Sequence, residues 1–407
     1  MQERYFSAIS MDMPRRALLK SMVGIAASSV LPTALLGMAT PIEPGASINP
    51  KWYGFNLLEY FSTDPDWMRY FPYRDDGSFK EVDFRWMRDW GFNWVRLPMD
   101  YRFWTDPGNL MKIEERKIEP IDRAIRLGEK YAIHINICLH RAPGECCLDG
   151  LVEKITGIHI TPEKTSLYRN QATLDAFVHQ WVYFAERYLG ISNERLSFNL
   201  VNEPQVVIGT QHVPDGRKEY ARVARAAIAG IRSKDPKRLI VTDGYNGVSW
   251  GLTTIPELFD TGILQSCHDY EPGPQLTHYH NEWARTSGSD QLPLPAWPLR
   301  DPQGRVVADK QTLEEEFRPW RELAQHGIPI HFGEMGCYKN TPPNVVYSWF
   351  NDTLDVIGGM HSGWALWNFR GPFGILDTER PGTQYQNWHG HQLDFMLLRI
   401  LQAKMRV

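Results

Sequence analysis

The sequence predicts an α/β protein that folds as a single-domain (β/α)8 barrel, the TIM-barrel fold. From about residue 50 onward, short apolar runs alternate eight times with longer amphipathic segments. Parallel strands need such crossovers, and eight of them close into a barrel that has no exposed edge. The 407 residues are 43% hydrophobic and 23% charged, which is ordinary globular composition. No linker rich in Pro, Gly or Ser divides the chain, so we expect residues 41–407 to form one domain.

The expected strands are short apolar runs that end at turn residues, at polar residues or at proline. Pro98, for example, is expected to end the second strand, because proline cannot donate a backbone hydrogen bond. The eight runs cover residues 52–55, 92–97, 132–139, 196–201, 238–242, 264–268, 329–333 and 363–367.

The expected helices lie between these strands and have apolar residues on one face. Ile118, Ile121 and Ile125 show the spacing, and Gly91 is a typical helix terminator. The helical segments cover residues 83–90, 114–131, 172–188, 217–232, 255–260, 313–326, 343–357 and 392–404. Two long insertions remain, residues 141–170 after the third strand and 271–310 after the sixth, and loops of this length are usually functional.

The N-terminal segment has the pattern of an export signal. Arg15 and Arg16 stand before an apolar, uncharged run over residues 22–39. The pattern resembles a twin-arginine (Tat) signal, with Pro14 in place of the usual Ser or Thr and Leu18 in place of the usual Phe. The alternative is an uncleaved membrane anchor, but a proline inside the run argues against it. We therefore interpret residues 1–40 as an export signal with a short preceding extension, and expect a periplasmic or extracellular protein without stable membrane association once the signal is removed.

Charge and cysteine content exclude several classes of protein. The net charge is −4 and no dense basic block is present, so nucleic-acid binding is not expected. Five cysteines form no disulfide framework and fit no zinc motif. The vicinal Cys146 and Cys147 leave two options open, since each can seek a partner or one can stay free. We expect no metal and no cofactor.

Polar residues stand where the predicted strands end. The active site of this fold lies at the C-terminal ends of its strands. The residues at those ends are Arg96, His140, Asn202, Glu203, His268, Asp269, Tyr270, Glu334 and Trp367. A set of ionisable residues placed this regularly indicates a functional site at the mouth of the barrel.

Glu203 and Glu334 are the expected catalytic residues. They follow the fourth and seventh strands, roughly opposite each other across the barrel mouth. Glycoside hydrolysis needs two such carboxyl groups: a separation of about 5–5.5 Å gives retention through a covalent intermediate, and about 6.5–9.5 Å leaves room for water and gives inversion. One must be protonated and the other ionised. Arg96 is a candidate cation beside the pair, and Tyr270 a candidate hydrogen-bond donor to Glu334.

At these positions the sequence resembles glycoside hydrolase family 5, within a clan of retaining barrel hydrolases. The resemblance covers nearly the whole chain from about residue 50. It implies that Glu203, in Asn-Glu-Pro, is the acid/base and that Glu334, in a Gly-Glu context, is the nucleophile. It also implies double displacement through a covalent glycosyl-enzyme, with no cofactor. The family's other conserved site positions are matched here by Arg96, His140, Asn202, His268, Tyr270 and Trp367.

The resemblance assigns substrate-binding roles to these remaining residues. Asn202 is expected to bind the sugar 2-hydroxyl, and Trp367 to form the floor beneath the attacked sugar. His140 and His268 are expected to line the pocket and not to shuttle protons. Weaker candidates for sugar stacking are Trp104, Trp250, Trp297 and Trp364.

The substrate is expected to be an oligo- or polysaccharide, and we favour a β-glucan. The alternatives within the family are a β-mannanase and an exo-acting β-glucosidase, the latter if the two insertions narrow the cleft to a pocket. Two other classes of protein are alternatives. A metal-dependent barrel hydrolase has only His278 and His280 as candidate ligands, without a carboxylate partner. A non-catalytic carbohydrate-binding barrel would lack one of the two glutamates, and both are present.

Overall fold

The computed structural model describes residues 49–61, 79–106, 108–146, 166–208, 211–213, 215–247, 251–281 and 291–405. The predicted export signal, most of the first insertion, Trp250 and Cys147 lie outside the described residues.

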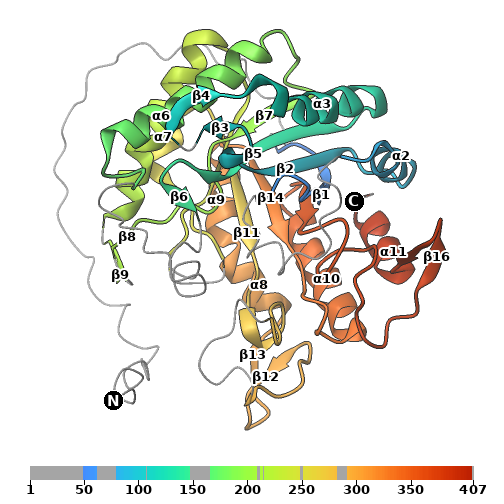
Figure 1. The fold of residues 1–407 in the computed structure, drawn as a ribbon. Helices are drawn as coiled ribbons and strands as arrows, with labels where there is room; N and C mark the ends of the chain where they lie inside the picture. Colours follow the sequence, from blue (N-terminus) through green and yellow to red (C-terminus); the bar gives the residue numbers. More distant parts are fainter. Residues whose placement is uncertain are drawn as a thin grey trace, which may run out of the picture. The chain divides into compact units, whose positions relative to one another are not determined.

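Eight parallel strands form a closed barrel, which confirms the predicted fold (Figure 1). They are β1 (Tyr53–Asn56), β2 (Trp94–Asp100), β5 (His134–Ala142), β7 (Leu196–Asn199), β10 (Ile240–Asp243), β11 (Leu264–Asp269), β14 (Ile330–Met335) and β15 (Trp364–Leu366). Each strand pairs with its sequence neighbour in the barrel, and the pairing of β1 with β15 closes it. The carboxyl ends of all eight strands therefore meet at one end of the barrel.

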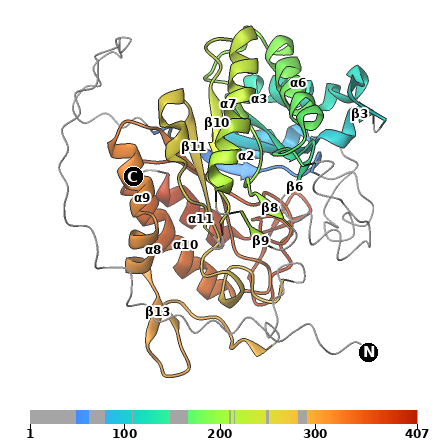
Figure 2. The ribbon, with the colours of Figure 1, turned by 90° about the vertical axis from the view of Figure 1, so that its left-hand side faces the viewer.

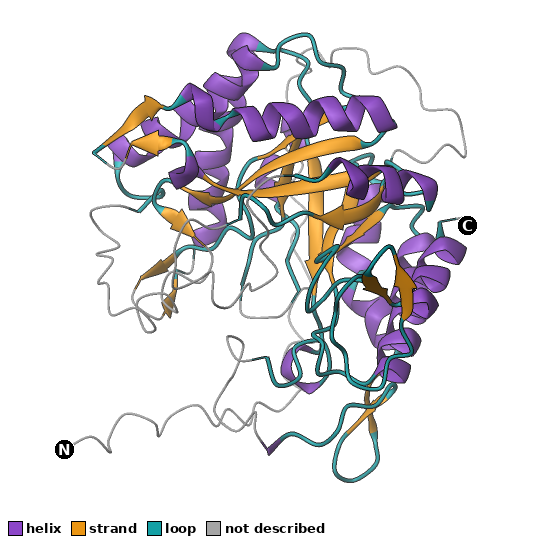
Figure 3. Cartoon of the chain, turned by 45° about the vertical axis from the view of Figure 1, so that its right-hand side comes forward, coloured by secondary structure: helices purple, strands orange, loops and turns teal. Residues whose placement is uncertain are grey.

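Helices follow the strands and pack on the outside of the barrel (Figures 2 and 3). They are α2 (Glu81–Asp89), α3 (Glu119–Tyr131), α6 (Gln171–Arg187), α7 (Gly216–Lys234), the 3-10 helix η3 (Pro256–Thr261), α8 (Lys310–Glu316), α9 (Arg318–Gln325), α10 (Pro343–Gly358) and α11 (Phe395–Lys404). In Figure 2, α3, α6 and α7 lie together, and α8 to α11 lie on the opposite side. Helix α3 buries Ile121 and Ile125, as its spacing predicts. Within the described residues, no helix has the length and apolar character needed to cross a bilayer.

The second strand does not end at Pro98, as the sequence suggested. β2 continues through Pro98 to Asp100. The reason is its pairing: β1 accompanies β2 only as far as Arg96, and beyond that residue β2 pairs with β5 alone. At Pro98, the side of β2 that faces β1 is therefore unpaired. The missing N–H of proline breaks no hydrogen bond between these two strands.

Other boundaries also differ from the prediction. The third strand begins at His134 and not at residue 132, because Ala132 is the left-handed cap of α3 (φ 57°). The predicted helix over residues 313–326 is two helices, α8 and α9, with Pro319 near the start of the second. The last helix begins at Phe395, because His391–Leu393 forms β17, which pairs with β16 (Gln386–Trp388).

The loops contain short antiparallel strand pairs that were not expected from the sequence. The pairs are β3 (Thr105–Asp106) with β4 (Asn109–Ile113), β8 (Val207–Ile208) with β9 (Gln211–His212), and β12 (Leu299–Arg300) with β13 (Val306–Ala308). β6 (Glu145–Cys146) adds an antiparallel strand to the end of β5. The β12–β13 hairpin belongs to the second insertion and projects away from the barrel (Figure 1).

Both ends of the barrel interior hold buried polar side chains. At the N-terminal end, His134 and His331 are buried, and Trp52 stacks on His134 with ring centroids 4.1 Å apart. Burial lowers the pKa of both histidines to about 3, so both are neutral. The C-terminal end holds the charged side chains of the candidate active site.

Candidate active site

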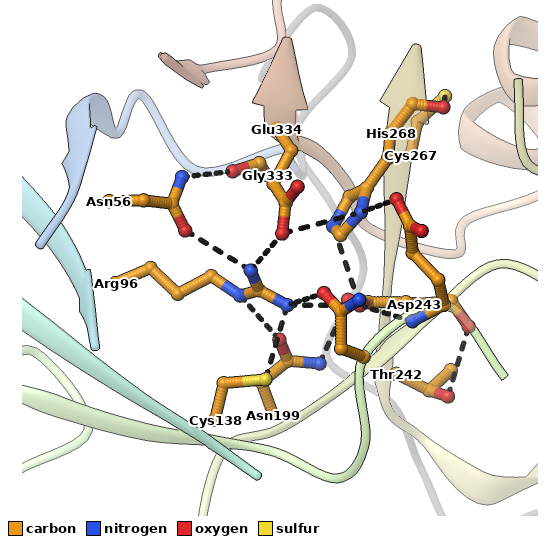
Figure 4. Close-up of polar contacts among 12 residues, drawn as sticks. Asn56, Arg96, Cys138, Asn199, Thr242, Asp243, Cys267, His268, Gly333 and Glu334 are labelled. Carbon is orange, nitrogen blue, oxygen red and sulfur yellow. Dashed lines mark hydrogen bonds and ion pairs between the residues drawn. The ribbon is translucent and has the colours of Figure 1, made fainter. Parts of the chain in front are cut away.

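Polar side chains from five strands converge at the C-terminal end of the barrel (Figure 4). Arg96 comes from β2, Asp243 from β10, His268 from β11 and Glu334 from β14. Glu203 follows β7 and is the most exposed of the group, with 20% of its side chain accessible. The other four are buried.

The two glutamates lie close together on either side of His268. One carboxylate oxygen of Glu203, one of Glu334 and a nitrogen of His268 all lie within 4.8 Å of one another. His268 Nδ1 is 2.9 Å from Glu203 Oε1 and 3.6 Å from Glu334 Oε1. A single group placed between the two glutamates can therefore contact both.

Glu334 is held by a cation and a hydroxyl. Arg96 Nη1 forms an ion pair with Glu334 Oε1, and the Tyr270 hydroxyl donates to Glu334 Oε2 at 3.1 Å. Burial raises the pKa of Glu334, while the charges of His268 and Arg96 limit that rise. Both contacts favour the ionised form of this carboxyl group and fix the direction of its oxygens.

Arg96, which binds Glu334, also donates hydrogen bonds to side-chain amides from other parts of the barrel. Its Nε donates to Asn199 Oδ1 at 2.7 Å, and its Nη1 donates to Asn56 Oδ1 at 3.1 Å. Its Nη2 donates to Asn202 Oδ1 at 2.8 Å and to Cys138 Sγ at 3.1 Å. Arginine has five donors in a rigid plane, so these contacts leave the guanidinium one orientation.

His268 is a cation in this environment. Burial alone would lower its pKa, but the carboxylates of Asp243 and Glu334 raise it to about 10. Its Nε2 lies 3.4 Å from Asp243 Oδ2, an ion pair rather than a well-aligned hydrogen bond. Both ring nitrogens of the imidazolium carry protons, and each faces a carboxylate.

A bulge in β14 brings His268 opposite Glu334. Cys267 pairs with Phe332, and His268 pairs with Glu334, so Gly333 is the extra residue. A Cβ at Gly333 would overlap Ser266 Oγ and would lie 3.3 Å from His268 Nε2. The glycine before Glu334 is therefore needed for β11 and β14 to approach this closely.

Aromatic rings form one wall of the site. Trp367 belongs to a cluster with Phe61, Tyr270 and Phe373. His140 lies against this wall, 4.4 Å from the ring of Phe61 and 5.3 Å from that of Trp367. Burial lowers the pKa of His140, so its ring is neutral, and its Nδ1 has no hydrogen-bond partner among the described residues. An unpaired ring nitrogen at this position can bind a substrate hydroxyl.

The structure thus brings all eight predicted site residues to one end of the barrel. Four of them do not follow their strands, however. Arg96, His140, His268 and Glu334 lie within the strands, because β2, β5, β11 and β14 run past them to Asp100, Ala142, Asp269 and Met335. Sequence reasoning missed Asn56, Asn199 and Asp243. Asn56, Asn199 and Asp243 end β1, β7 and β10, so the rule that active-site residues stand at strand ends would have found all three.

The three weaker tryptophan candidates within the described residues are not at the site. Trp104 is fully buried, and its Nε1 donates to Gln180 at 2.7 Å. Trp364 is buried against Tyr53. Trp297 donates to Asp352 at 2.8 Å and packs on the main core. Trp104 and Trp364 belong to the core, and Trp297 anchors the second insertion to α10.

His278, weighed as a metal ligand, packs against the site as an aromatic group. Its ring is buried and meets Tyr270 edge-on at 4.9 Å. Burial lowers its pKa to about 3. Among the described residues, the one group with the spacing of metal ligands is Glu203, His268 and Glu334, and His268 carries a proton on each nitrogen in its charged form.

The chain is similar to known proteins over most of its length. A family model described as cellulase (glycosyl hydrolase family 5) matches residues 49–371. Endoglucanase C of Acetivibrio thermocellus is 22% identical over 313 residues, which cover 72% of this chain and 85% of that protein. Cellodextrinase A of Ruminococcus flavefaciens is 24% identical over 291 residues, which cover 70% of this chain and 77% of that protein.

Solved structures have the same fold. The crystal structure of a glycoside hydrolase is 34% identical in sequence, with a TM-score of 0.74, and the match covers 87% of this chain and 99% of that one. Endoglucanase Cel5A of Thermotoga maritima is 22% identical, with a TM-score of 0.61 and coverage of 86% and 97%. The chain therefore belongs to glycosyl hydrolase family 5, and it is a glycoside hydrolase.

Proposed function

We propose that this glycoside hydrolase is a retaining enzyme that cleaves β-linked glucans by double displacement. The spacing of the acid pair carries the proposal. One oxygen of Glu203 and one of Glu334 lie within 4.8 Å. Retaining enzymes hold their carboxyl groups about 5–5.5 Å apart, and inverting enzymes need about 6.5–9.5 Å to admit a water molecule between sugar and base.

The environments of the two glutamates support different roles. Glu334 is buried and receives hydrogen bonds from Arg96 and Tyr270, which suits an ionised nucleophile of fixed direction. Glu203 is more exposed and borders the site, which suits a group that exchanges protons with the leaving group and with water.

In the first step, Glu203 donates its proton to the glycosidic oxygen as that oxygen leaves. Glu334 attacks the anomeric carbon at the same time, and a glycosyl ester forms. In the second step, Glu203 removes a proton from water, the water oxygen attacks the anomeric carbon, and Glu334 leaves as a carboxylate. The sugar is released with its original β configuration, and both glutamates return to their starting states.

The glucan substrate is supported by the relatives. Their names are endoglucanase and cellodextrinase. The Thermotoga maritima enzyme of similar fold was solved with cellobiose and with mannotriose, so mannan is the alternative within the same geometry. The second insertion adds the segment that includes Trp297 beside the barrel, and a site narrowed by the insertions would favour short or terminal substrates.

Activity on β-glycosides tests the proposal. The wild-type protein is assayed on an aryl β-cellobioside and on cello-, laminari- and manno-oligosaccharides, with NMR detection of the first anomer released. We expect the β anomer and hydrolysis of glucans. The Glu334→Gln variant should lose activity by about 10⁴-fold or more, since the nucleophile is replaced by an amide.

The control is Glu257→Gln, which removes a carboxylate that pairs with Arg217 at 2.9 Å outside the site. It should keep wild-type activity. Release of the α anomer would contradict the retaining mechanism, and cleavage of mannan alone would contradict the glucan assignment. Internal cleavage of long polymers would exclude an exo-acting pocket.

We also propose that the protein is exported. The support is the sequence pattern of residues 13–39, with Arg15 and Arg16 before an apolar run. Residues 1–46 fused to a folded reporter should direct it out of the cytoplasm, and the double substitution Arg15→Lys and Arg16→Lys should stop this transport. Export that persists in the double variant would contradict a twin-arginine signal.

A further inference from the structure

Asp243 is a third carboxylate in the site, beside Glu203 and Glu334. It is the last residue of β10 and is fully buried. The position lies on the fifth strand, which contributes neither of the two catalytic glutamates. A buried carboxylate is costly unless it is paired and hydrogen-bonded, so its contacts indicate what it does.

The carboxylate of Asp243 receives contacts on both oxygens (Figure 4). Its Oδ1 accepts a hydrogen bond from Asn199 Nδ2 at 2.9 Å. Its Oδ2 accepts from Arg96 Nη2 at 3.0 Å and from the backbone N–H of Glu203 at 3.1 Å, and lies 3.4 Å from His268 Nε2. Asp243 therefore contacts four residues of the barrel mouth. Two of these contacts reach Glu203, one directly at its backbone N–H and one through His268.

The first contact fixes the backbone of Glu203. This residue has φ 41°, a left-handed conformation that residues other than glycine rarely adopt. Pro204 follows it, and a residue before proline is restricted further. A strained conformation persists only when surrounding contacts hold it, and the hydrogen bond from the Glu203 N–H to Asp243 is such a contact.

The second contact fixes the side chain of Glu203 through His268. The imidazolium lies between Asp243, at Nε2, and Glu203, at Nδ1. Because the ring is held at one end by Asp243, the other end presents its N–H to Glu203 Oε1 in a defined direction. The carboxylate of Asp243 also raises the pKa of His268 and so keeps this donor charged.

We propose that Asp243 is a positioning residue for the acid/base: it holds the backbone of Glu203 directly and its carboxyl group through His268, so that the proton of Glu203 points at the glycosidic oxygen. The inference rests on the proposed retaining mechanism. Asp243 does not touch the reacting atoms, and its effect reaches the substrate only through Glu203.

The nucleophile depends less on Asp243, although His268 also lies 3.6 Å from Glu334 Oε1. Arg96 also touches Asp243, but it keeps hydrogen bonds to Glu334, Asn199, Asn202 and Asn56 when that contact is removed. Tyr270 holds the other oxygen of Glu334. Loss of Asp243 should therefore impair proton donation more than nucleophilic attack.

The Asp243→Asn variant separates these two effects. Asparagine has nearly the same shape, but its amide nitrogen cannot accept a hydrogen bond. It can therefore accept from the donors on only one side of the carboxylate, either Asn199 or the pair Arg96 and Glu203 N–H. The test compares kcat/KM on 2,4-dinitrophenyl and phenyl β-cellobioside. This parameter reports events up to the covalent intermediate, and the dinitrophenolate leaves without a proton whereas the phenolate needs one.

We expect kcat/KM to fall by roughly 10²-fold on the phenyl substrate and by less than about fivefold on the dinitrophenyl substrate. The matched control is Asp83→Asn, because Asp83 is also a buried carboxylate paired with an arginine, Arg370. That variant should show no difference between the two leaving groups. Circular dichroism and trapping with a 2-fluoro dinitrophenyl cellobioside count the folded, nucleophile-competent molecules in each preparation.

Equal losses on both substrates, or wild-type activity on both, would overturn the inference. If Asp243→Asn does not fold, Asp243→Ser is measured in its place, since it removes the charge and leaves room for water. Failure of the proposed function is recognised separately: in that case the wild-type enzyme itself has no activity on either substrate, or Glu334→Gln keeps it.

Discussion

Arg96 and Glu334 form a buried ion pair inside the barrel mouth, although two strands, β1 and β15, lie between β2 and β14 in the sheet. The arginine reaches across the interior because its strand continues past it to Asp100, which leaves the side chain pointing inward from the middle of β2. The nucleophile is thus oriented by a residue from the opposite part of the barrel wall.

The Arg96→Lys variant should lower kcat/KM by roughly 10²-fold. Lysine keeps the charge but cannot donate to Glu334, Asn199 and Asn202 together, so the carboxylate loses its fixed direction. Steady-state kinetics on an aryl β-cellobioside measure the loss. Arg238→Lys, at another buried arginine that pairs with Asp235, is the control and should keep its activity. Equal kinetics for Arg96→Lys and wild type would contradict the orienting role.

The Gly333→Ala variant should lose activity by roughly 10²-fold, because displacement of a catalytic group by about 1 Å can cost this much. The added methyl group overlaps Ser266 Oγ and crowds His268 Nε2. A second substitution, Ser266→Ala, removes the nearer obstacle and should restore part of the rate. A double variant no better than Gly333→Ala alone would show that the crowding is not at Ser266.

The Trp367→Ala variant should raise KM about tenfold, since a stacking face for a sugar is worth about 1 kcal/mol or more. Trp367 packs with Phe61 and Tyr270, so Trp367→Phe should keep most of the binding and most of the fold. KM for cellobiosides and the melting temperature are measured for both variants. An unchanged KM in Trp367→Ala would place the sugar elsewhere.

Stability should fall as the pH is lowered from 6.5 towards 3. Burial lowers the pKa of His134, His278 and His331 from 6.5 to about 3 in the folded protein. Between these values the unfolded chain binds more protons than the folded one, so acid favours unfolding by up to about 1.4 kcal/mol per pH unit for each histidine.

Denaturant unfolding at several pH values measures this slope. His278→Phe removes one of the three groups and keeps an aromatic ring against Tyr270. Its free energy of unfolding should depend less steeply on pH than that of the wild type. The same slope in both proteins would contradict the assignment of His278 as a neutral, buried histidine.

The alternation of apolar and amphipathic segments was enough to predict the barrel and the order of its strands. The pattern is local, since each run reflects one strand or helix. The ends of the strands were predicted less accurately, as at Pro98, because the length of a strand depends on how far the neighbouring strands pair with it. That information lies in the pairing of β1 with β2 and not in the segment itself.

The sequence predicted those site residues that stand at the ends of its apolar runs. The sequence does not reveal Asp243, because the apolar run of the fifth strand ends at Thr242, and a polar residue after a strand resembles an ordinary turn. Its importance comes from contacts with Arg96, His268 and the backbone of Glu203, which are far apart in the sequence. The prediction that Trp104 and Trp364 stack on sugar is wrong, since both are buried in the core. Residue type alone does not tell which side of a barrel a ring faces.

The ionic groups of the mouth also balance one another through the reaction. Arg96 and His268 are positive, and Asp243 and Glu334 are negative, so the site is neutral while Glu203 carries its proton. Once that proton passes to the leaving group, the protein holds one net negative charge just as positive charge develops on the sugar ring. The barrel mouth thus supplies a negative charge that develops as the oxocarbenium-like transition state forms.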